Sequence, residues 1–114
     1  MNKKLRRGHI FWANLDPTIG VEIKKLRPVI IMSNNVINQR SRLVIVVPIT
    51  TNIKHFSPSH VLIPKGESGL AKTSKALAEQ IRAIDKQRLV NYAGSMSPRV
   101  LKLVEQAIQN SLDM

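Results

Sequence analysis

Two apolar stretches, 28-PVIIMS-33 and 42-RLVIVVPI-49, decide the fold that we expect for this sequence. Both are rich in β-branched residues and carry apolar side chains at consecutive positions, so each predicts a strand that is buried on both faces. Pro28 suits the first residue of its strand, where a missing backbone N–H is tolerated. The stretch between them, 34-NNVINQRS-41, is polar and begins with turn-forming asparagines, and we expect one helical turn there.

Shorter strands are predicted on either side of this pair. An apolar and aromatic strand comes first, and the later segment Lys75–Ile84 is ambiguous, because its residues favour a helix while its apolar side chains alternate. We interpret Lys75–Ile84 as a strand, followed by a turn at Asp85–Arg88. The remaining predicted strands are Gly8–Asn14, His60–Pro64 and Leu89–Gly94.

One helix is expected, at the C-terminal end of the sequence. Ser97 can cap it, and Pro98 suits its first position. Its apolar residues fall on one face, which we expect to be core or dimer interface: Val100, Leu101, Val104, Ala107, Ile108 and Leu112. Many short strands with one closing helix, and no alternation of strands and helices, indicate a mainly β fold built on a small barrel. A length of 114 residues suits a single domain over residues 1–114.

The charge is strongly positive and unevenly distributed. The formal net charge is +11, and residues 1–65 hold 11 of the 18 Lys and Arg residues but only two acidic residues. Such a surplus attracts polyanions, so we expect a polyanion site in the N-terminal half; the plainer alternative is a basic surface that serves solubility. The absence of cysteine excludes disulfides and thiolate chemistry, and we expect a cytoplasmic protein that spans no membrane.

Motifs for several classes of chemistry are absent from the sequence. There is no HExxH, no calcium-binding loop pattern, no P-loop and no GxGxxG, so we expect no metal ion and no cofactor. His55 and His60 are the only close histidine pair. They leave open an acid–base pair for RNA cleavage, although strand alternation gives them no obvious common site.

Several segments, taken in order, resemble the MazF/PemK toxins, which are sequence-specific endoribonucleases. The segments are 7-RGHIFWANLDPT-18, 20-GVE-22, 26-LRPVII-31, 47-VPITT-51 and 79-EQIRAIDKQR-88, and the resemblance extends over about residues 6–112. It implies an SH3-like barrel with a C-terminal helix, working as a homodimer. It also implies metal-independent cutting of single-stranded RNA, usually mRNA, and a cognate antitoxin whose acidic C-terminal segment covers the RNA groove.

The resemblance also implies the catalytic residues. Arg27 would stabilise the charge of the transition state, and Thr50 would bond a phosphate oxygen, with Thr51 as the alternative in register. Glu22 would accept the proton of the 2′-OH or bond a base edge. The structural alternatives are an ion pair between Arg27 and Glu22 and a turn bond at Thr50.

Further family positions imply contacts with RNA. Base edges would be read by Glu79, Gln80, Asn34 and Asn38. Phosphates would be held by Lys24, Lys25 and Arg82. The sequence departs from the family pattern at His9, where an acidic residue is usual, and at Ile23 and Lys25, where Gln and Gly are usual.

Two other functions stay open on the sequence. Some toxins with a similar barrel bind gyrase, a protein target, and cut no RNA. A basic module that binds RNA without cleaving it is the other alternative. The Arg27-Pro28 pair and Thr50 favour the nuclease.

Overall fold

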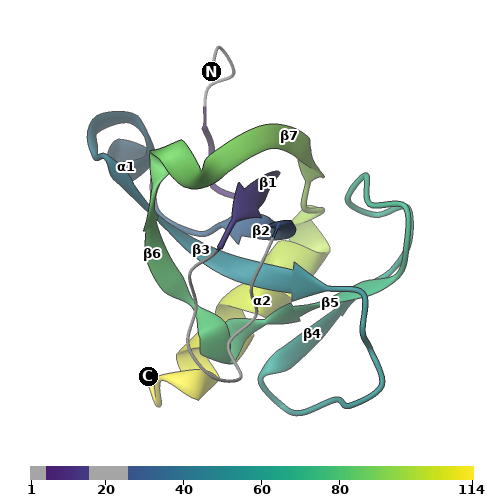
Figure 1. The fold of residues 1–114 in the computed structure, drawn as a ribbon. Helices are drawn as coiled ribbons and strands as arrows, with labels where there is room; N and C mark the ends of the chain where they lie inside the picture. The colour runs from purple at the N-terminus through teal and green to yellow at the C-terminus, as the bar shows by residue number, and fades with distance from the viewer. Residues whose placement is uncertain (1–4, 16–25) are drawn as a thin grey trace.

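The computed structural model describes residues 5–15 and 26–114, which form a mainly β fold with a long C-terminal helix (Figure 1). The strands are β1 (His9–Asn14), β2 (Leu26–Ile31), β3 (Leu43–Thr50), β4 (His60–Ile63), β5 (Ser74–Leu77), β6 (Arg82–Asp85) and β7 (Leu89–Ser95). The helices are α1 (Asn35–Arg40) and α2 (Pro98–Ser111), with short 3₁₀ turns η1 (Ala78–Gln80) and η2 (Lys86–Arg88). No helix among the described residues is long and apolar enough to cross a membrane.

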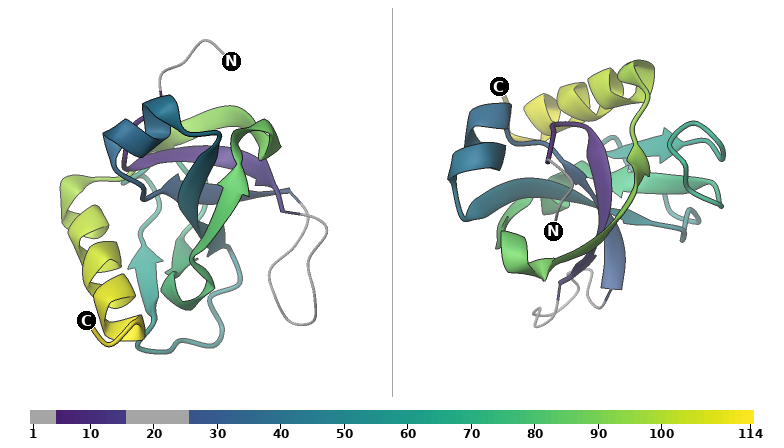
Figure 2. Two further views of the ribbon diagram at one scale, coloured as in Figure 1. Left: turned by 90° about the vertical axis from the view of Figure 1, so that its left-hand side faces the viewer. Right: turned by 90° about the horizontal axis from the view of Figure 1, so that it is seen from above.

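The strands form one antiparallel sheet with the order β4-β5-β3-β2-β1-β7, and β6 pairs with β3 beside β5. The part made of β7, β1, β2, β3 and β6 curls strongly, and η2 connects its two edges (Figure 2). The described strands do not close into a full barrel, because β6 and β7 are joined by this turn and not by a ladder of hydrogen bonds. The predicted mainly β fold with a C-terminal helix is confirmed, as a curled sheet that stays open.

Two apolar cores lie on opposite faces of β1, β2 and β3. Within β2, Val29 and Ile31 face the inside of the curl, whereas Ile30 faces the opposite core. The inner core also contains Phe11, Val44 and Val46. Because successive residues of a strand point to opposite faces, only a strand that separates two cores needs apolar residues at every position. This explains the apolar runs that predicted doubly buried strands.

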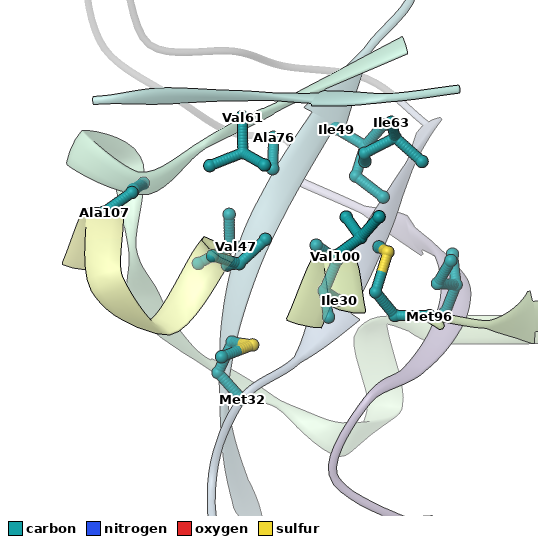
Figure 3. Packing of buried hydrophobic residues seen from close by; sticks show 13 residues of the cluster. Ile30, Met32, Val47, Ile49, Val61, Ile63, Ala76, Met96, Val100 and Ala107 are labelled. Atoms are coloured by element: carbon teal, nitrogen blue, oxygen red, sulfur yellow. The ribbon is translucent and has the colours of Figure 1, made fainter. Parts of the chain in front are cut away.

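The second core joins the sheet to α2. Figure 3 shows Ile30, Val47 and Ile49 from the sheet pointing toward Val100 of the helix. The helix begins as predicted: the side chain of Ser97 accepts a hydrogen bond from the backbone N–H of Val100, at 3.3 Å, and Pro98 is its first residue. Most of the predicted apolar face packs on this core, whereas Leu112 follows the end of the helix and is exposed.

The segment Lys75–Ile84 is not one strand. β6 pairs with the start of β3, and continuing the register of Val46 with Arg82 would place Thr50 opposite Ala78. Thr50 pairs instead with Lys75 of β5, so three residues are looped out between the two strands. These three residues form η1. The alternating pattern predicted the strands before and after η1 but not η1 itself.

Candidate active site

Arg27 and Thr50 come together at one end of the sheet. β2 and β3 are antiparallel, with Val29 opposite Pro48. Continuing that register by two residues places Arg27 opposite Thr50. Directly opposed residues of an antiparallel pair project from the same face, with Cβ atoms about 4.5–5.5 Å apart. The central strands, which are fixed by two cores, therefore position both side chains where β2 begins and β3 ends.

A first hollow lies beside Arg27 and has a volume of about 310 Å³. Arg27 and Lys72 supply its cationic groups, and Thr51 supplies a hydroxyl. The other lining residues are mostly apolar: Trp12, Pro28, Ile49, Leu70, Ala71 and Ser74. A cavity of this kind, apolar with a few converging cations, suits a ligand that combines a flat ring with an anionic group.

A second hollow, of about 280 Å³, begins on the other side of the β3 end. Thr50 and Lys75 line it from neighbouring strands, and Glu79 and Gln80 line it from η1. The remaining lining residues are Asn52, His60 and Leu77. Since Thr50 lines this hollow and Thr51 the first, the end of β3 separates the two and offers a hydroxyl to each.

His60 holds the carboxylate of Glu79. The Nδ1 atom of His60 accepts a hydrogen bond from the backbone N–H of Ser57, at 3.2 Å. A ring nitrogen that accepts carries no proton, so the ring proton belongs on Nε2. Nε2 lies 3.1 Å from an Oε atom of Glu79 and donates to it. This bond leaves Glu79 in a fixed position at the rim of the second hollow, where it can accept a hydrogen bond from a ligand.

The two hollows are positively charged together. Arg27, Lys72 and Lys75 line them, and Glu79 is the one carboxylate among their described lining residues. A concave surface that carries mainly one sign of charge concentrates ligands of the opposite sign. Across residues 5–15 and 26–114, no group of three His, Asp or Glu side chains could hold a metal ion. The cations and hydroxyls that line the two hollows can bind and polarise a phosphodiester.

The structure brings together three of the residues that the sequence singled out, Thr50, Glu79 and Gln80, around the second hollow. Arg27 lines the first hollow, at the same end of the sheet. Arg82 lies at the start of β6, opposite Val46, which comes earlier in β3 than Thr50. The expected roles of Glu22, Lys24 and Lys25 fall on residues outside the described ranges.

Asn34 and Asn38 are not at this end of the sheet. They lie at α1, which follows the opposite end of β2. The side chain of Asn34 caps α1 by accepting from the N–H of Ile37, at 2.9 Å. Asn38 is buried. Its Oδ1 atom accepts a hydrogen bond from the hydroxyl of Ser33, at 2.5 Å, and its Nδ2 atom donates one to the carbonyl of Ser33, at 2.9 Å. These hydrogen bonds shape the turn after β2, away from Arg27, and that Asn34 and Asn38 read bases stays a prediction.

Two residues of the second hollow were missed in the sequence. Lys75 directly precedes the apolar residues 76-ALA-78 in a predicted strand, and that position is the available signal. For His60, the sequence suggests only a pairing with His55. Nothing local in the sequence shows that it meets Glu79, 19 residues away, because the looped-out η1 makes that contact.

Comparisons with known proteins agree on one family. Residues 6–112 match the model of the PemK-like, MazF-like toxin of type II toxin–antitoxin systems. The chain is 37% identical to "Endoribonuclease EndoA" of Bacillus subtilis, covering 95% of this chain and 94% of the relative. It is 41% identical to "Endoribonuclease MazF" of Staphylococcus saprophyticus, covering 96% and 92%.

Solved structures show the same fold. MazF from Deinococcus radiodurans superposes with a TM-score of 0.86 at 25% identity, covering 99% of this chain and 100% of that one. A mycobacterial endoribonuclease, solved in complex with its cognate antitoxin, superposes with a TM-score of 0.81 at 24% identity, covering 96% of both chains.

Proposed function

The chain belongs to the PemK-like, MazF-like toxins of type II toxin–antitoxin systems, and we propose that it cuts single-stranded RNA, mRNA in particular, at the end of β2 and β3. One observation carries the proposal: the register of β2 and β3, continued by two residues, places Arg27 opposite Thr50, and the two residues line neighbouring hollows that together carry a positive charge. Relatives at 37% and 41% identity over nearly their full length are named endoribonucleases. The gyrase-binding alternative is not favoured by these relatives.

The proposed reaction is a transesterification that uses no metal ion. The ribose 2′-oxygen attacks the adjacent phosphorus and forms a new O–P bond, while the bond from phosphorus to the 5′-oxygen breaks. The 2′-OH loses its proton to a base, and the departing 5′-oxygen takes up a proton. The products are a 2′,3′-cyclic phosphate and a 5′-OH end. The protein must therefore stabilise a phosphorane-like transition state with an additional negative charge.

Arg27 has the chemistry for that charge. A guanidinium can donate two parallel hydrogen bonds to phosphate oxygens, and its position on a strand fixed by two cores costs little reorganisation. The hydroxyl of Thr50 adds one donor to a non-bridging oxygen. We assign Glu22 as the base that accepts the 2′-OH proton, on its match to the family pattern.

The second hollow is the proposed place for base recognition. Unstacked bases of single-stranded RNA expose edges that carboxylates and amides can bond. Glu79, held by His60, accepts from such an edge, and Gln80 both donates and accepts. Phosphates of the same strand are held by Lys24, Lys25 and Arg82.

We also propose the partners that the family implies. The protein works as a homodimer in the cytoplasm, as one domain over residues 1–114. Its cognate antitoxin has an acidic C-terminal segment that occupies the RNA groove, and a net charge of +11 complements such a segment. One similar fold, the mycobacterial endoribonuclease, was solved with its cognate antitoxin.

The test is incubation of the purified protein with single-stranded RNA in excess EDTA, followed by analysis of the ends. We expect cleavage that EDTA does not reduce, with 2′,3′-cyclic phosphate and 5′-OH ends. Activity that is lost in EDTA and returns with Mg²⁺ contradicts the mechanism. RNA that is bound but stays intact identifies a binding module.

A further inference from the structure

Lys75 is a buried lysine at the proposed site that the reaction described above does not use. Lys75 is only 5% exposed, although it lines the second hollow. It lies on β5 directly opposite Thr50, so the two side chains project from the same face of the β3–β5 pair. A lysine is almost never this buried unless it is paired.

The protein supplies little compensation for this charge. The Nζ atom of Lys75 donates to the backbone carbonyl of His55, which uses one of its three donors. Within the described ranges, no carboxylate lies at ion-pair distance from Lys75; Glu79, which lines the same hollow, is bonded by His60. Burying an ammonium without a counter-charge is unfavourable, and a bound anion removes that cost.

We propose that Lys75 is a phosphate-binding residue, which holds the phosphodiester adjacent to the scissile one on the side of Glu79 and Gln80. The assignment rests on the proposed function and extends its site. Thr50, at the end of β3, lines the hollow of Lys75, and the next residue, Thr51, lines the hollow of Arg27. A nucleotide whose base meets Glu79 and Gln80 brings its own phosphate to the floor of the second hollow, where the free donors of Lys75 can bond it.

A purely structural role is the competing explanation. Through the carbonyl of His55, Lys75 ties the segment 51–59 to β5, and this tie alone could account for a lysine here. The two explanations differ in whether the positive charge of Lys75 is needed. A tie needs only an N–H donor, which Gln can supply, whereas a phosphate contact also needs the positive charge.

The experiment compares Lys75→Met and Lys75→Gln with the wild type and with Lys102→Met, a matched change at an exposed lysine of α2. Each protein is titrated with an RNA made uncleavable by a 2′-deoxy substitution, at several salt concentrations. A second series replaces one phosphate at a time by an uncharged methylphosphonate. Thermal unfolding of each variant is measured in parallel, and cleavage of ordinary RNA by the wild type and by Lys102→Met is the control for the proposed function.

We expect both Lys75 variants to lose about 10-fold or more in RNA affinity, as for a hydrogen bond to a charged group. Their slope of log affinity against log salt should fall in magnitude by about 0.7, the value for one phosphate contact of a single strand. One methylphosphonate, next to the cleavage position, should weaken the wild type but not the variants. Their melting temperature should not fall.

Unchanged affinity and salt slope in Lys75→Met, or a methylphosphonate pattern equal to that of the wild type, would overturn the proposal. A lower melting temperature in Lys75→Met that Lys75→Gln restores, with RNA binding intact, would assign Lys75 to the structural tie. If the wild type and Lys102→Met neither bind nor cleave RNA, the proposed function fails, and the role of Lys75 fails with it.

Discussion

The two ends of β2 both carry polar residues but use them in different ways. At the α1 end, Asn34 caps the helix and the amide of Asn38 is bonded within the turn. At the Arg27 end, charged side chains line two hollows of about 310 and 280 Å³. Thr50 is intermediate, because its hydroxyl accepts a hydrogen bond from the backbone N–H of Asn52, at 3.2 Å, and can still donate one to a ligand. A polar residue near a strand end indicates a ligand site only where its local hydrogen bonds leave a donor or acceptor for the ligand. We therefore expect changes at the two ends to separate activity from stability.

The largest effect is expected for Arg27→Ala. Removing one preorganised donor to developing charge typically costs about 10²–10³ in rate. Binding of an uncleavable RNA should fall far less, because other cations share the phosphates and the guanidinium acts mainly on the transition state. Single-turnover cleavage, measured beside binding of that RNA, separates the two effects.

Arg27→Lys is the matched variant for this measurement. It should restore only part of the rate, because an ammonium lacks the planar fork of a guanidinium. A wild-type rate in Arg27→Ala would remove Arg27 from the site, and an unfolded Arg27→Ala would make it a structural residue of β2.

At the other end, Asn38→Ala should lower stability and leave chemistry alone. The change removes the side-chain hydrogen bonds to Ser33, and the buried carbonyl of Ser33 loses its donor. We expect a loss of about 2–3 kcal/mol in the free energy of unfolding, measured with urea. The cleavage rate per folded molecule should stay at the wild-type value. A large fall in that rate without a loss of stability would place RNA at α1.

A smaller effect is expected for Thr50→Val, which keeps the shape of the side chain and removes its hydroxyl. The loss of one hydrogen bond to a charged phosphate should slow cleavage by about 10-fold. The same change at Thr51, which lines the neighbouring hollow, is the control for register. If Thr51→Val slows cleavage more than Thr50→Val does, Thr51 and not Thr50 supplies the hydroxyl that bonds the phosphate.

Much of the fold could be predicted because its central strands have to separate two cores. An apolar residue at every position from Val29 to Ile31 leaves few alternatives to a doubly buried strand. The start of helix α2 could also be predicted, from Ser97 as its cap and Pro98 as its first residue. The break at η1 was not, because a shift of three residues between β5 and β6 depends on how both strands pair with β3.

The site was predictable only in part, for the same physical reason. The family pattern predicts Arg27 and Thr50, and the register of β2 and β3, continued by two residues, places them opposite each other. The roles of Lys75 and His60 depend on contacts across strands that no local pattern contains. The burial of Asn38 was likewise not predictable, because its sequence neighbours do not show it.

The most direct test of where RNA lies is a nuclear magnetic resonance titration of the backbone amides with an uncleavable single-stranded RNA. We expect the largest chemical-shift changes at the end of β3 and in the segment from Lys75 to Gln80, whose residues line the second hollow. The amides of Asn35–Arg40 in α1 should stay unchanged. Shifts concentrated on α1, with none at Thr50 or Lys75, would contradict the assignment of the RNA site to the Arg27 end of the sheet.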